Sequence, residues 1–171
     1  MGNSAIGGIT RSRLKSAVTK TGADDLVNAI HSRLICEEVT FAESGVEGVY
    51  TGSVSVPALA TIMDIIVNGV VLWGAGTSAT MKVGDAADDD GYFTAVNLKA
   101  TDLLAAESIN FAFAGGKAGA YIANSQVSPR YSATARVISG VVTTVGTTSS
   151  VGRTRMTVYY SLPKVTAATK V

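Results

Sequence analysis

Apolar and polar residues alternate along most of the chain from residue 38 onward, and this period of two is typical of β-strands. Val39 and Phe41 start the pattern, and residues 49–56 continue it with Val, Thr and Ser at alternating positions. Residues 152–162 show it most clearly. There, one alternate set should face one way and the other set the opposite way; the first comprises Arg153, Arg155, Thr157 and Tyr159, and the second Thr154, Met156, Val158 and Tyr160.

Further short apolar runs are separated by turn signals. These runs span residues 60–67, 70–73, 80–84, 92–96 and 131–142. Pro57 ends the strand before it, and Asn68 with Gly69 predicts a two-residue hairpin. The polar segment 85–91 and the Thr/Ser/Gly segment 143–151 predict two more turns. About eight strands at this spacing predict a mainly β fold, which is an antiparallel β-sandwich, a jelly roll or a barrel.

The N-terminal part of the chain lacks this alternation. Residues 1–22 are rich in Gly, Ser and Thr with scattered basic residues, which predicts an extended arm that is ordered only by contact. Asp24 or Asp25 can cap a helix, and apolar residues follow at helical spacing: Leu26, Val27, Ile30 and Leu34. We therefore expect one short amphipathic helix over about residues 24–35.

These patterns divide the chain into three parts. We expect the arm and the short helix in residues 1–37, the β domain in residues 38–162, and a flexible tail in residues 163–171. Residues 98–130 are the least regular stretch of the β domain, and the glycines within 115–119 predict a flexible loop there.

Composition agrees with a folded domain that has neither a disulfide nor a membrane span. Apolar residues make up 47% of the chain and aromatic residues only 6%, so the few large side chains, such as Trp73, Tyr92 and Phe93, should lie in the core. Cys36 is the single cysteine, and its apolar neighbours predict a small buried side chain. No apolar run reaches the ~18 residues that span a bilayer, so we expect a soluble protein without a secretory signal.

Charge is segregated along the chain. Residues 1–36 carry five basic and two acidic residues, residues 37–110 carry two basic and eleven acidic residues, and residues 111–171 carry seven basic residues and no acidic ones. Opposite charges on separate segments favour a protein that binds other proteins by charge complementarity. The expected contact residues are Arg11, Arg13, Lys15, Arg153, Arg155, Asp88, Asp89 and Asp90. Nucleic acid is a disfavoured partner, because the acidic middle would repel a polyanion.

The candidate motifs for catalysis, cofactor binding or metal binding lack the residues or the spacing that their chemistry requires. The acidic segment 84–91 lacks the spacing of an EF-hand, so a solvated turn is a better interpretation than a Ca²⁺ site. Ala118 follows the Gly-Lys at 116–117, where a phosphate-binding loop needs Ser or Thr. His31 is the single histidine, and no nucleophile elbow accompanies it. We expect no enzyme, no catalytic residue, no cofactor and no metal.

Several segments resemble those of tailed-bacteriophage virion proteins, most of all small head-decoration (cement) proteins with a β-sandwich or jelly-roll body. The segments are 54–57 (VSVP), 81–85 (MKVGD), 88–93 (DDDGYF) and 155–160 (RMTVYY), and the likeness covers roughly residues 46–162. The resemblance implies a virion protein made in the host cytoplasm and located on the capsid surface. It implies the major capsid protein and further copies of the chain, as a homodimer or homotrimer, as partners, and no catalysis.

Two other functions stay open at this point. One is a different virion component, such as a capsid, tail or adsorption protein. The other is a β domain that binds a small ligand or a carbohydrate, with Trp73, Tyr92 and Phe93 lining a cavity instead of filling a core.

Overall fold

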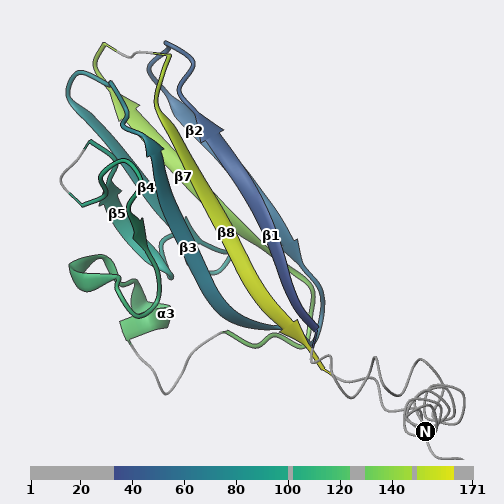
Figure 1. Cartoon of the computed structure of the whole chain (residues 1–171). Helices are drawn as coiled ribbons and strands as arrows, with labels where there is room; N and C mark the ends of the chain where they lie inside the picture. The colour runs from purple at the N-terminus through teal and green to yellow at the C-terminus, as the bar shows by residue number, and fades with distance from the viewer. Residues whose placement is uncertain (1–32, 100–101, 124–129, 148–149, 164–171) are drawn as a thin grey trace, which may run out of the picture. The chain divides into compact units, whose positions relative to one another are not determined.

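Two four-stranded antiparallel sheets pack face to face in the computed structural model (Figure 1). It describes residues 33–99, 102–123, 130–147 and 150–163. The elements are β1 (Arg33–Ala42), β2 (Val49–Val56), β3 (Thr61–Val71), β4 (Ser78–Gly84), β5 (Phe93–Asn97), β6 (Ser108–Ile109), the 3-10 helix η1 (Gly115–Lys117), the helix α3 (Ala120–Ala123), β7 (Arg136–Val145) and β8 (Arg153–Leu162). No helix among these described residues is long and apolar enough to cross a membrane.

The strand order identifies the topology. The first sheet runs β1-β8-β3-β6 and the second runs β2-β7-β4-β5. Strands one, three, six and eight therefore lie in one sheet and the other four in the second, which is the order of a jelly roll. This confirms the predicted mainly β sandwich and selects the jelly roll over a closed barrel.

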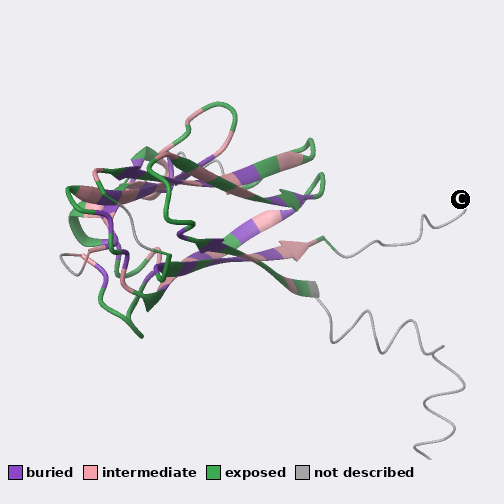
Figure 2. Cartoon of the chain, turned by 90° about the horizontal axis from the view of Figure 1, so that it is seen from above, coloured by how far each residue is buried: buried purple, intermediate pink, exposed green. Residues whose placement is uncertain are grey.

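Alternation along the strands places the core between the two sheets, as the bands of buried residues in Figure 2 show. On β8, Thr154, Met156, Val158 and Tyr160, which the alternation places on one face, are buried, and Thr157 from the other set is only 6% exposed. The predicted core residues Trp73, Tyr92 and Phe93 are buried as well. Full burial of a large apolar side chain contributes about 1.5–3 kcal/mol, so this shared core holds the two sheets together.

The hairpin predicted at Asn68 and Gly69 is wrong. Both residues lie inside β3, where Asn68 pairs with Arg155 of β8 and with Ser108 of β6. A Cβ atom on Gly69 would lie 2.5 Å from the carbonyl oxygen of Leu104. Glycine therefore serves here for a close approach between a strand and a loop and not for a tight turn.

The end of the predicted helix and the burial of Cys36 also need correction. Residues 33–35, placed at the end of the predicted helix, belong to β1, and Ile35 packs against the core. Residues 24–32 and the predicted arm lie outside the described residues. Cys36 on β1 is exposed and not buried, because it alternates with the inward-facing Ile35.

The irregular stretch contains more structure than predicted. Its glycine segment forms η1 instead of a flexible loop, and α3 follows directly. The backbone N–H of Tyr121 donates to the carbonyl of Gly91 at 2.8 Å, and that of Gly119 donates to the carbonyl of Tyr92 at 2.9 Å. These bonds anchor α3 to the turn before β5.

Candidate protein-binding surfaces

The arginines of β8 lie on the outer face of the first sheet. The alternation that buries Thr154 and Met156 leaves Arg153 and Arg155 exposed. The Nε atom of Arg155 lies 3.7 Å from a carboxylate oxygen of Glu38 on β1, and these side chains are 44% and 56% exposed. An ion pair this open contributes little to stability. Both guanidinium groups therefore remain accessible to a partner.

The rest of this outer face mixes acidic, polar and apolar side chains, and the apolar ones include Leu34 on β1 and Val70 on β3, which are 62% and 47% exposed. Asp64 on β3 accepts hydrogen bonds from the backbone N–H groups of Ile65, at 2.9 Å, and Phe111, at 3.0 Å. A hydrogen bond with Cys36 raises the pKa of Tyr159, which lies beside Asp64 in the register of β8 and β3. The face is therefore a mixed polar and apolar surface, with the basic groups described above on β8.

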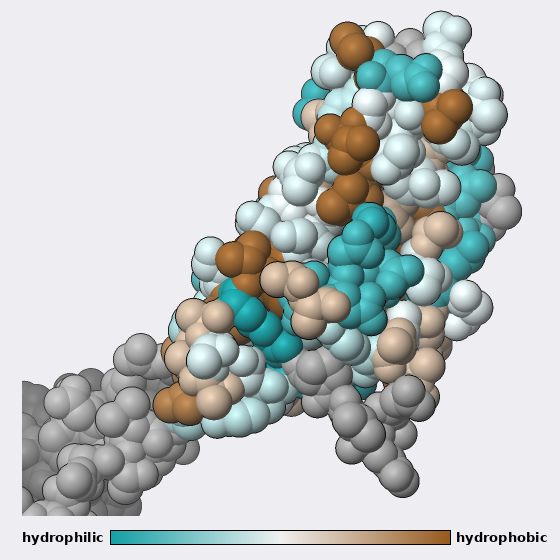
Figure 3. Space-filling model, turned by 180° about the vertical axis from the view of Figure 1, so that it is seen from behind, coloured by the Kyte–Doolittle hydropathy of each residue, from teal (hydrophilic) through white to brown (hydrophobic). Residues whose placement is uncertain are grey.

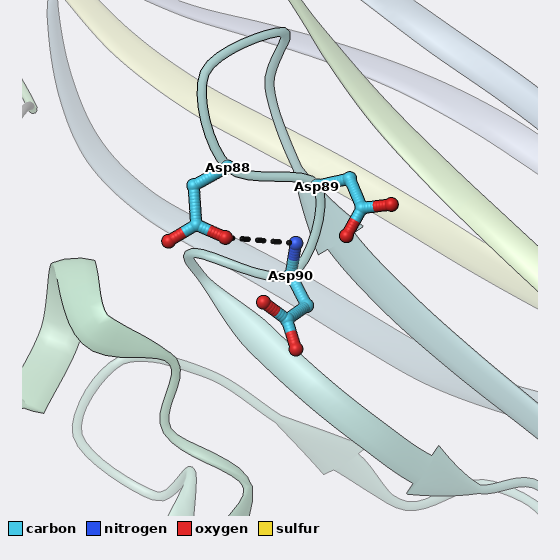
Figure 4. Close-up of side chains that lie close together, drawn as sticks. All are labelled: Asp88, Asp89 and Asp90. Atoms are coloured by element: carbon cyan, nitrogen blue, oxygen red, sulfur yellow. Dashed lines mark hydrogen bonds between the residues drawn. The ribbon is translucent and has the colours of Figure 1, made fainter.

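Asp88, Asp89 and Asp90 lie in the turn between β4 and β5, where Figure 4 shows their carboxylates close together. One carboxylate oxygen from each residue lies within 4.8 Å of those of the other two. Asp88 accepts a hydrogen bond from the backbone N–H of Asp90 at 3.4 Å, and Asp89 forms an ion pair with Lys82. The side-chain hydrogen bond with Asp88, together with burial and the neighbouring charges, raises the pKa of Asp90.

Asp85 anchors this acidic turn, residues 85–91, to the rest of the fold. Its Oδ1 atom accepts hydrogen bonds from the N–H groups of Ala87, at 3.0 Å, and Asp88, at 3.3 Å, and from the Tyr121 hydroxyl at 3.0 Å. Its Oδ2 atom lies 3.6 Å from Arg136 on β7, and both of these side chains are only 11% exposed. Burial and the hydrogen bond to Asp85 raise the pKa of Tyr121 to about 12.

These contacts favour a structural turn over a calcium site. Calcium takes about six to eight oxygen ligands. The carboxylate of Asp85 is occupied by backbone, phenol and guanidinium groups, and that of Asp89 by Lys82. The carboxylates of Asp88 and Asp90 alone do not supply a calcium coordination shell.

The outer face of the second sheet differs from that of the first, because its strands carry one charged residue and its acidic groups come from the acidic turn. Asp90 of that turn lines a hollow on this face together with Thr80 and Val141. We name the outer face of the second sheet the Val/Thr/Ser face. It comprises Val49, Thr51, Ser53 and Ser55 on β2, Val137, Ser139, Val141, Thr143 and Val145 on β7, Ser78, Thr80 and Lys82 on β4, and Ala95 and Asn97 on β5. Lys82 is its one charged member, and Asp89 pairs with it. Figure 3 views the molecule from this side and shows hydrophobic patches and strongly hydrophilic clusters among weakly polar side chains.

An open groove of about 490 Å³ lies between the acidic turn, α3 and the start of β7. Tyr121, Tyr131, Asp85 and Arg136 contribute to its lining. Asp85, Tyr121 and Arg136 bind one another, as described above. The groove therefore does not favour the small-ligand alternative, which needs polar groups directed at the ligand.

The predicted contact residues fall into separate regions. Arg153 and Arg155 share one face of the first sheet, whereas the acidic turn follows a strand of the second sheet. Arg11, Arg13 and Lys15 lie outside the described residues. Sequence reasoning missed Asp85 and the extent of the Val/Thr/Ser face. The alternating Val, Thr and Ser of residues 49–56 was a local signal for that face, but its four strands come together only through the topology.

The strand order and the buried alternate positions define the chain as a jelly-roll domain. No protein-family model and no curated protein matches its sequence. Among solved structures, a chain of the cyanophage Pam1 capsid asymmetric unit is similar, with a TM-score of 0.50 and 18% identity over 77% of this chain and 86% of that chain. At this identity the likeness is one of fold.

Two further solved structures match with lower TM-scores. A chain of the acidic stable capsid of Helicobacter pylori bacteriophage KHP30 has a TM-score of 0.42 and 16% identity, over 75% of this chain and 94% of that chain. A chain of the capsid of Ralstonia phage GP4 has a TM-score of 0.47 and 15% identity, over 76% of this chain and 84% of that chain.

Proposed function

We propose that this chain is a non-enzymatic structural protein of a phage virion, which binds the capsid surface and stabilises it by bridging neighbouring capsid subunits. The observation that carries the proposal is the eight-stranded jelly roll, which the chain shares with a chain of the cyanophage Pam1 capsid asymmetric unit. A jelly roll alone is compatible with several functions, since lectins and cupins use it too. The distribution of charge favours the virion among them.

Charge supports attachment to other proteins. Residues 33–163 carry eleven acidic and eight basic residues, whereas the segments on either side, 1–32 and 164–171, each carry two more basic than acidic residues. Segments of opposite charge attract neighbouring bodies and subunits. Each exposed ion pair contributes only about 0–1 kcal/mol, but an assembled shell repeats the same contact many times.

We assign the attachment to the basic groups of the arm, Arg11, Arg13 and Lys15, and to Arg153 and Arg155 on β8. The two β8 arginines are exposed on a sheet face, and Glu38 holds one of them only weakly. Asp88, Asp89 and Asp90 are weaker candidates, because Lys82 already compensates part of their charge. A protein that binds only the assembled shell shifts the assembly equilibrium toward that shell.

Charge reversal on β8 tests the attachment. Purified R153E/R155E protein is mixed with assembled shells of the phage that encodes it, and binding is measured by co-sedimentation. We expect at least a tenfold loss of affinity, about 1.4 kcal/mol, because reversed charges repel an acidic partner. The matched variant R153K/R155K keeps both charges and should retain most of the binding. Equal binding by parent and R153E/R155E would remove β8 from the attachment surface.

Deletion of residues 1–22 tests the arm. The truncated protein keeps every strand of the jelly roll and should still fold, but we expect it to lose shell binding. Full occupancy of shells by the truncated protein would show that the arm is dispensable. Failure of the parent chain itself to co-sediment with shells would overturn the proposed function.

A further inference from the structure

We infer that the free edge of β2 is a docking site for an extended, basic segment of another protein, which adds to the second sheet as a further strand. β2 is a terminal strand of that sheet and pairs on one side only, with β7. A strand at a sheet edge offers a row of backbone N–H and C=O groups to a second chain. The inference goes beyond the proposed function and does not rest on it, because strand addition requires no shell.

The direction of these backbone groups follows from the ladder between β2 and β7. The N–H of Thr144 donates to the carbonyl of Gly48 at 2.9 Å, which continues the register of Val49 with Thr143. Bonded positions alternate in an antiparallel pair, so the even-numbered residues of β2 bond to β7. The N–H and C=O groups of the odd-numbered residues point to the free edge: Val49, Thr51, Ser53 and Ser55. Among the residues that the structure describes, no hydrogen-bond partner reaches these backbone groups.

β2 differs from the other three edge strands, because it has none of the features that prevent pairing at a sheet edge. Such features are charge on the edge strand, proline, a bulge, a very short strand or a covering segment. β1 carries two glutamates, β6 spans two residues, and η1 covers β5, where the ammonium of Lys117 donates to the carbonyl of Ala95 at 3.2 Å. β2 spans eight residues without charge or proline, and its register with β7 is continuous. An edge left open in this way indicates a surface that another strand covers.

The free edge of β2 lies beside β1 of the first sheet (Figure 1). A Cβ atom on Gly52 would lie 2.7 Å from a methyl group of Val39. Glu37 points to the same inner side of β1, because its Oε1 atom accepts a hydrogen bond at 2.7 Å from the hydroxyl of the buried Tyr160. Glu37 is nevertheless exposed. Side chains on the inner face of an added strand would therefore meet this carboxylate.

Charge at this edge selects a basic partner. Residues 34–56 carry four acidic residues and no basic one. Three of the four are buried or bonded to a cation or a backbone N–H, namely Glu38, Glu43 and Glu47. Within the described part of the chain, Glu37 contacts a neutral hydroxyl, which leaves its charge available to a Lys or Arg of the added strand. A second β2 edge in its place would oppose acidic groups with acidic groups.

An open hollow of about 260 Å³ at the end of β2 favours apolar residues on the other face of the added strand. Its lining is mostly apolar and comprises Ser55, Val56, Pro57, Ala135, Arg136 and Val137. Val137 is 47% exposed and lies opposite Ser55 on the outer face. The residue that bonds to Ser55 presents its side chain to this face, beside the hollow. The partner that fits therefore alternates apolar and basic residues.

Fluorescence anisotropy with a labelled peptide tests the inference on the purified full chain. The probe alternates Lys and Val and has the length of β2. We expect saturable binding with a dissociation constant below about 1 mM. A peptide with Glu in place of Lys should bind at least about tenfold more weakly, because it opposes the charge of Glu37.

N-methylation of the probe separates strand addition from simple charge attraction. The valines of the bound probe share the outer face with Ser53 and Ser55, so their N–H groups point at β2. Methylation of the valine nitrogens should weaken binding at least about tenfold, because it removes these donors. Methylation of the lysine nitrogens is the matched control, since those N–H groups point away from β2, and it should change binding by no more than about threefold.

Substitutions on the protein give the complementary test. Ser53→Pro removes one N–H from the free edge and none from the ladder with β7, so we expect at least about fivefold weaker binding. Ser53→Ala keeps the N–H and should stay within about twofold of the parent. Glu37→Gln retains an acceptor for Tyr160 without the charge and should weaken binding a few-fold. Asp89→Asn, an exposed carboxylate on the acidic turn, is its control and should leave binding unchanged.

Four results would overturn the inference. They are the absence of saturable binding, equal binding of the Lys and Glu peptides, equal binding of the two methylated peptides, and unchanged binding by Ser53→Pro. Binding that appears only after deletion of residues 1–22 would assign the edge to this chain's own N-terminal segment and would overturn it as well. The peptide measurements use the unmodified protein, so they decide the question even if Ser53→Pro does not fold.

Discussion

The acidic turn and the arginine pair of β8 carry opposite charges. Their charged side chains differ in how many contacts they make within the fold and in how exposed those contacts are. In the turn, Asp85 accepts three hydrogen bonds and contacts Arg136, with both side chains only 11% exposed. On β8, Arg155 lies 3.7 Å from one exposed carboxylate. Both places are clusters of like charge in the sequence. The contacts of these charged side chains differ. Charges with several buried contacts stabilise the fold, whereas charges with one exposed contact are accessible to a partner.

This difference predicts opposite outcomes for substitutions in the two regions. Changes in the turn should lower the free energy of unfolding, because they leave buried groups without partners. Changes at the arginines should alter partner binding and leave the free energy of unfolding nearly unchanged. Four substitutions test the contrast, from the largest expected effect to the smallest.

Gly119→Ala should have the largest effect. A Cβ atom there would lie 2.2 Å from the carbonyl oxygen of Asp90 and 2.3 Å from that of Gly91, and both neighbours are backbone atoms of the acidic turn. We expect the free energy of unfolding to fall by about 4 kcal/mol, because backbone cannot move aside as a flexible side chain does. Urea unfolding followed by tryptophan fluorescence measures it.

Gly116→Ala is the matched control for this change. A Cβ atom at Gly116 meets no atom within 4 Å. Its effect should stay within about 0.5 kcal/mol, as for an ordinary surface substitution. Similar losses in both variants would mean that the turn is not packed tightly against the segment that contains η1 and α3.

Asp85→Ala should follow in size. The change removes the acceptor of two backbone N–H groups and of the Tyr121 hydroxyl, and it leaves the guanidinium of Arg136 without its carboxylate. We expect a loss of about 3 kcal/mol in the free energy of unfolding. Asp89→Ala is the control, because Asp89 is exposed and pairs only at the surface, and its loss should stay near about 0.5 kcal/mol. A reversed order of the two losses would contradict the assigned roles.

The sequence predicts the strands well, because each strand encodes its own buried and exposed faces. Residues 49–56 and 152–162 alternate as they do in β2 and β8. Strand order was predictable only as a class of folds, since it depends on pairings between distant segments. At Asn68 and Gly69 the local turn preference gave the wrong prediction, because pairing with β8 and the approach of Leu104 determine the structure there.

The candidate surfaces were predictable in part, because the sequence encodes the faces of one strand but not the contacts between distant segments. Arg153 and Arg155 were expected to share one face of the last strand, and alternation alone is enough to place them together. The role of Asp85 was not predictable. Its partners Tyr121 and Arg136 lie far along the chain and meet it only through α3 and β7.

Tyr121→Phe should have a smaller effect that depends on pH. Losing the hydroxyl removes one hydrogen bond to Asp85, so we expect a loss of about 1 kcal/mol near neutral pH. Burial and this bond raise the pKa of Tyr121 to about 12, above the value of about 10 for an unfolded tyrosine. A raised pKa means that the folded state keeps the proton, so this stabilisation is complete below pH 10 and is lost as the pH rises through 12.

The difference between parent and Tyr121→Phe should therefore shrink as the pH rises above 10. Urea unfolding at several alkaline pH values measures it. Tyr160, whose pKa burial also raises to about 12, is present in both proteins and cancels in the difference. Tyr131→Phe is the control, because Tyr131 is 54% exposed and should change stability by less than about 0.5 kcal/mol. A difference that grows with pH would assign the alkaline loss to other groups.

Arg155→Ala should change the free energy of unfolding least, by no more than about 0.5 kcal/mol, because its pair with Glu38 is long and open to solvent. A double-mutant cycle with Glu38→Ala should give a coupling energy of similar or smaller size. The measurement uses the same urea unfolding as for the turn variants. A loss above about 1 kcal/mol would place Arg155 among the groups that hold the fold. In that case, weaker shell binding by R153E/R155E would reflect a damaged sheet, and the contrast between the two charged regions would no longer hold.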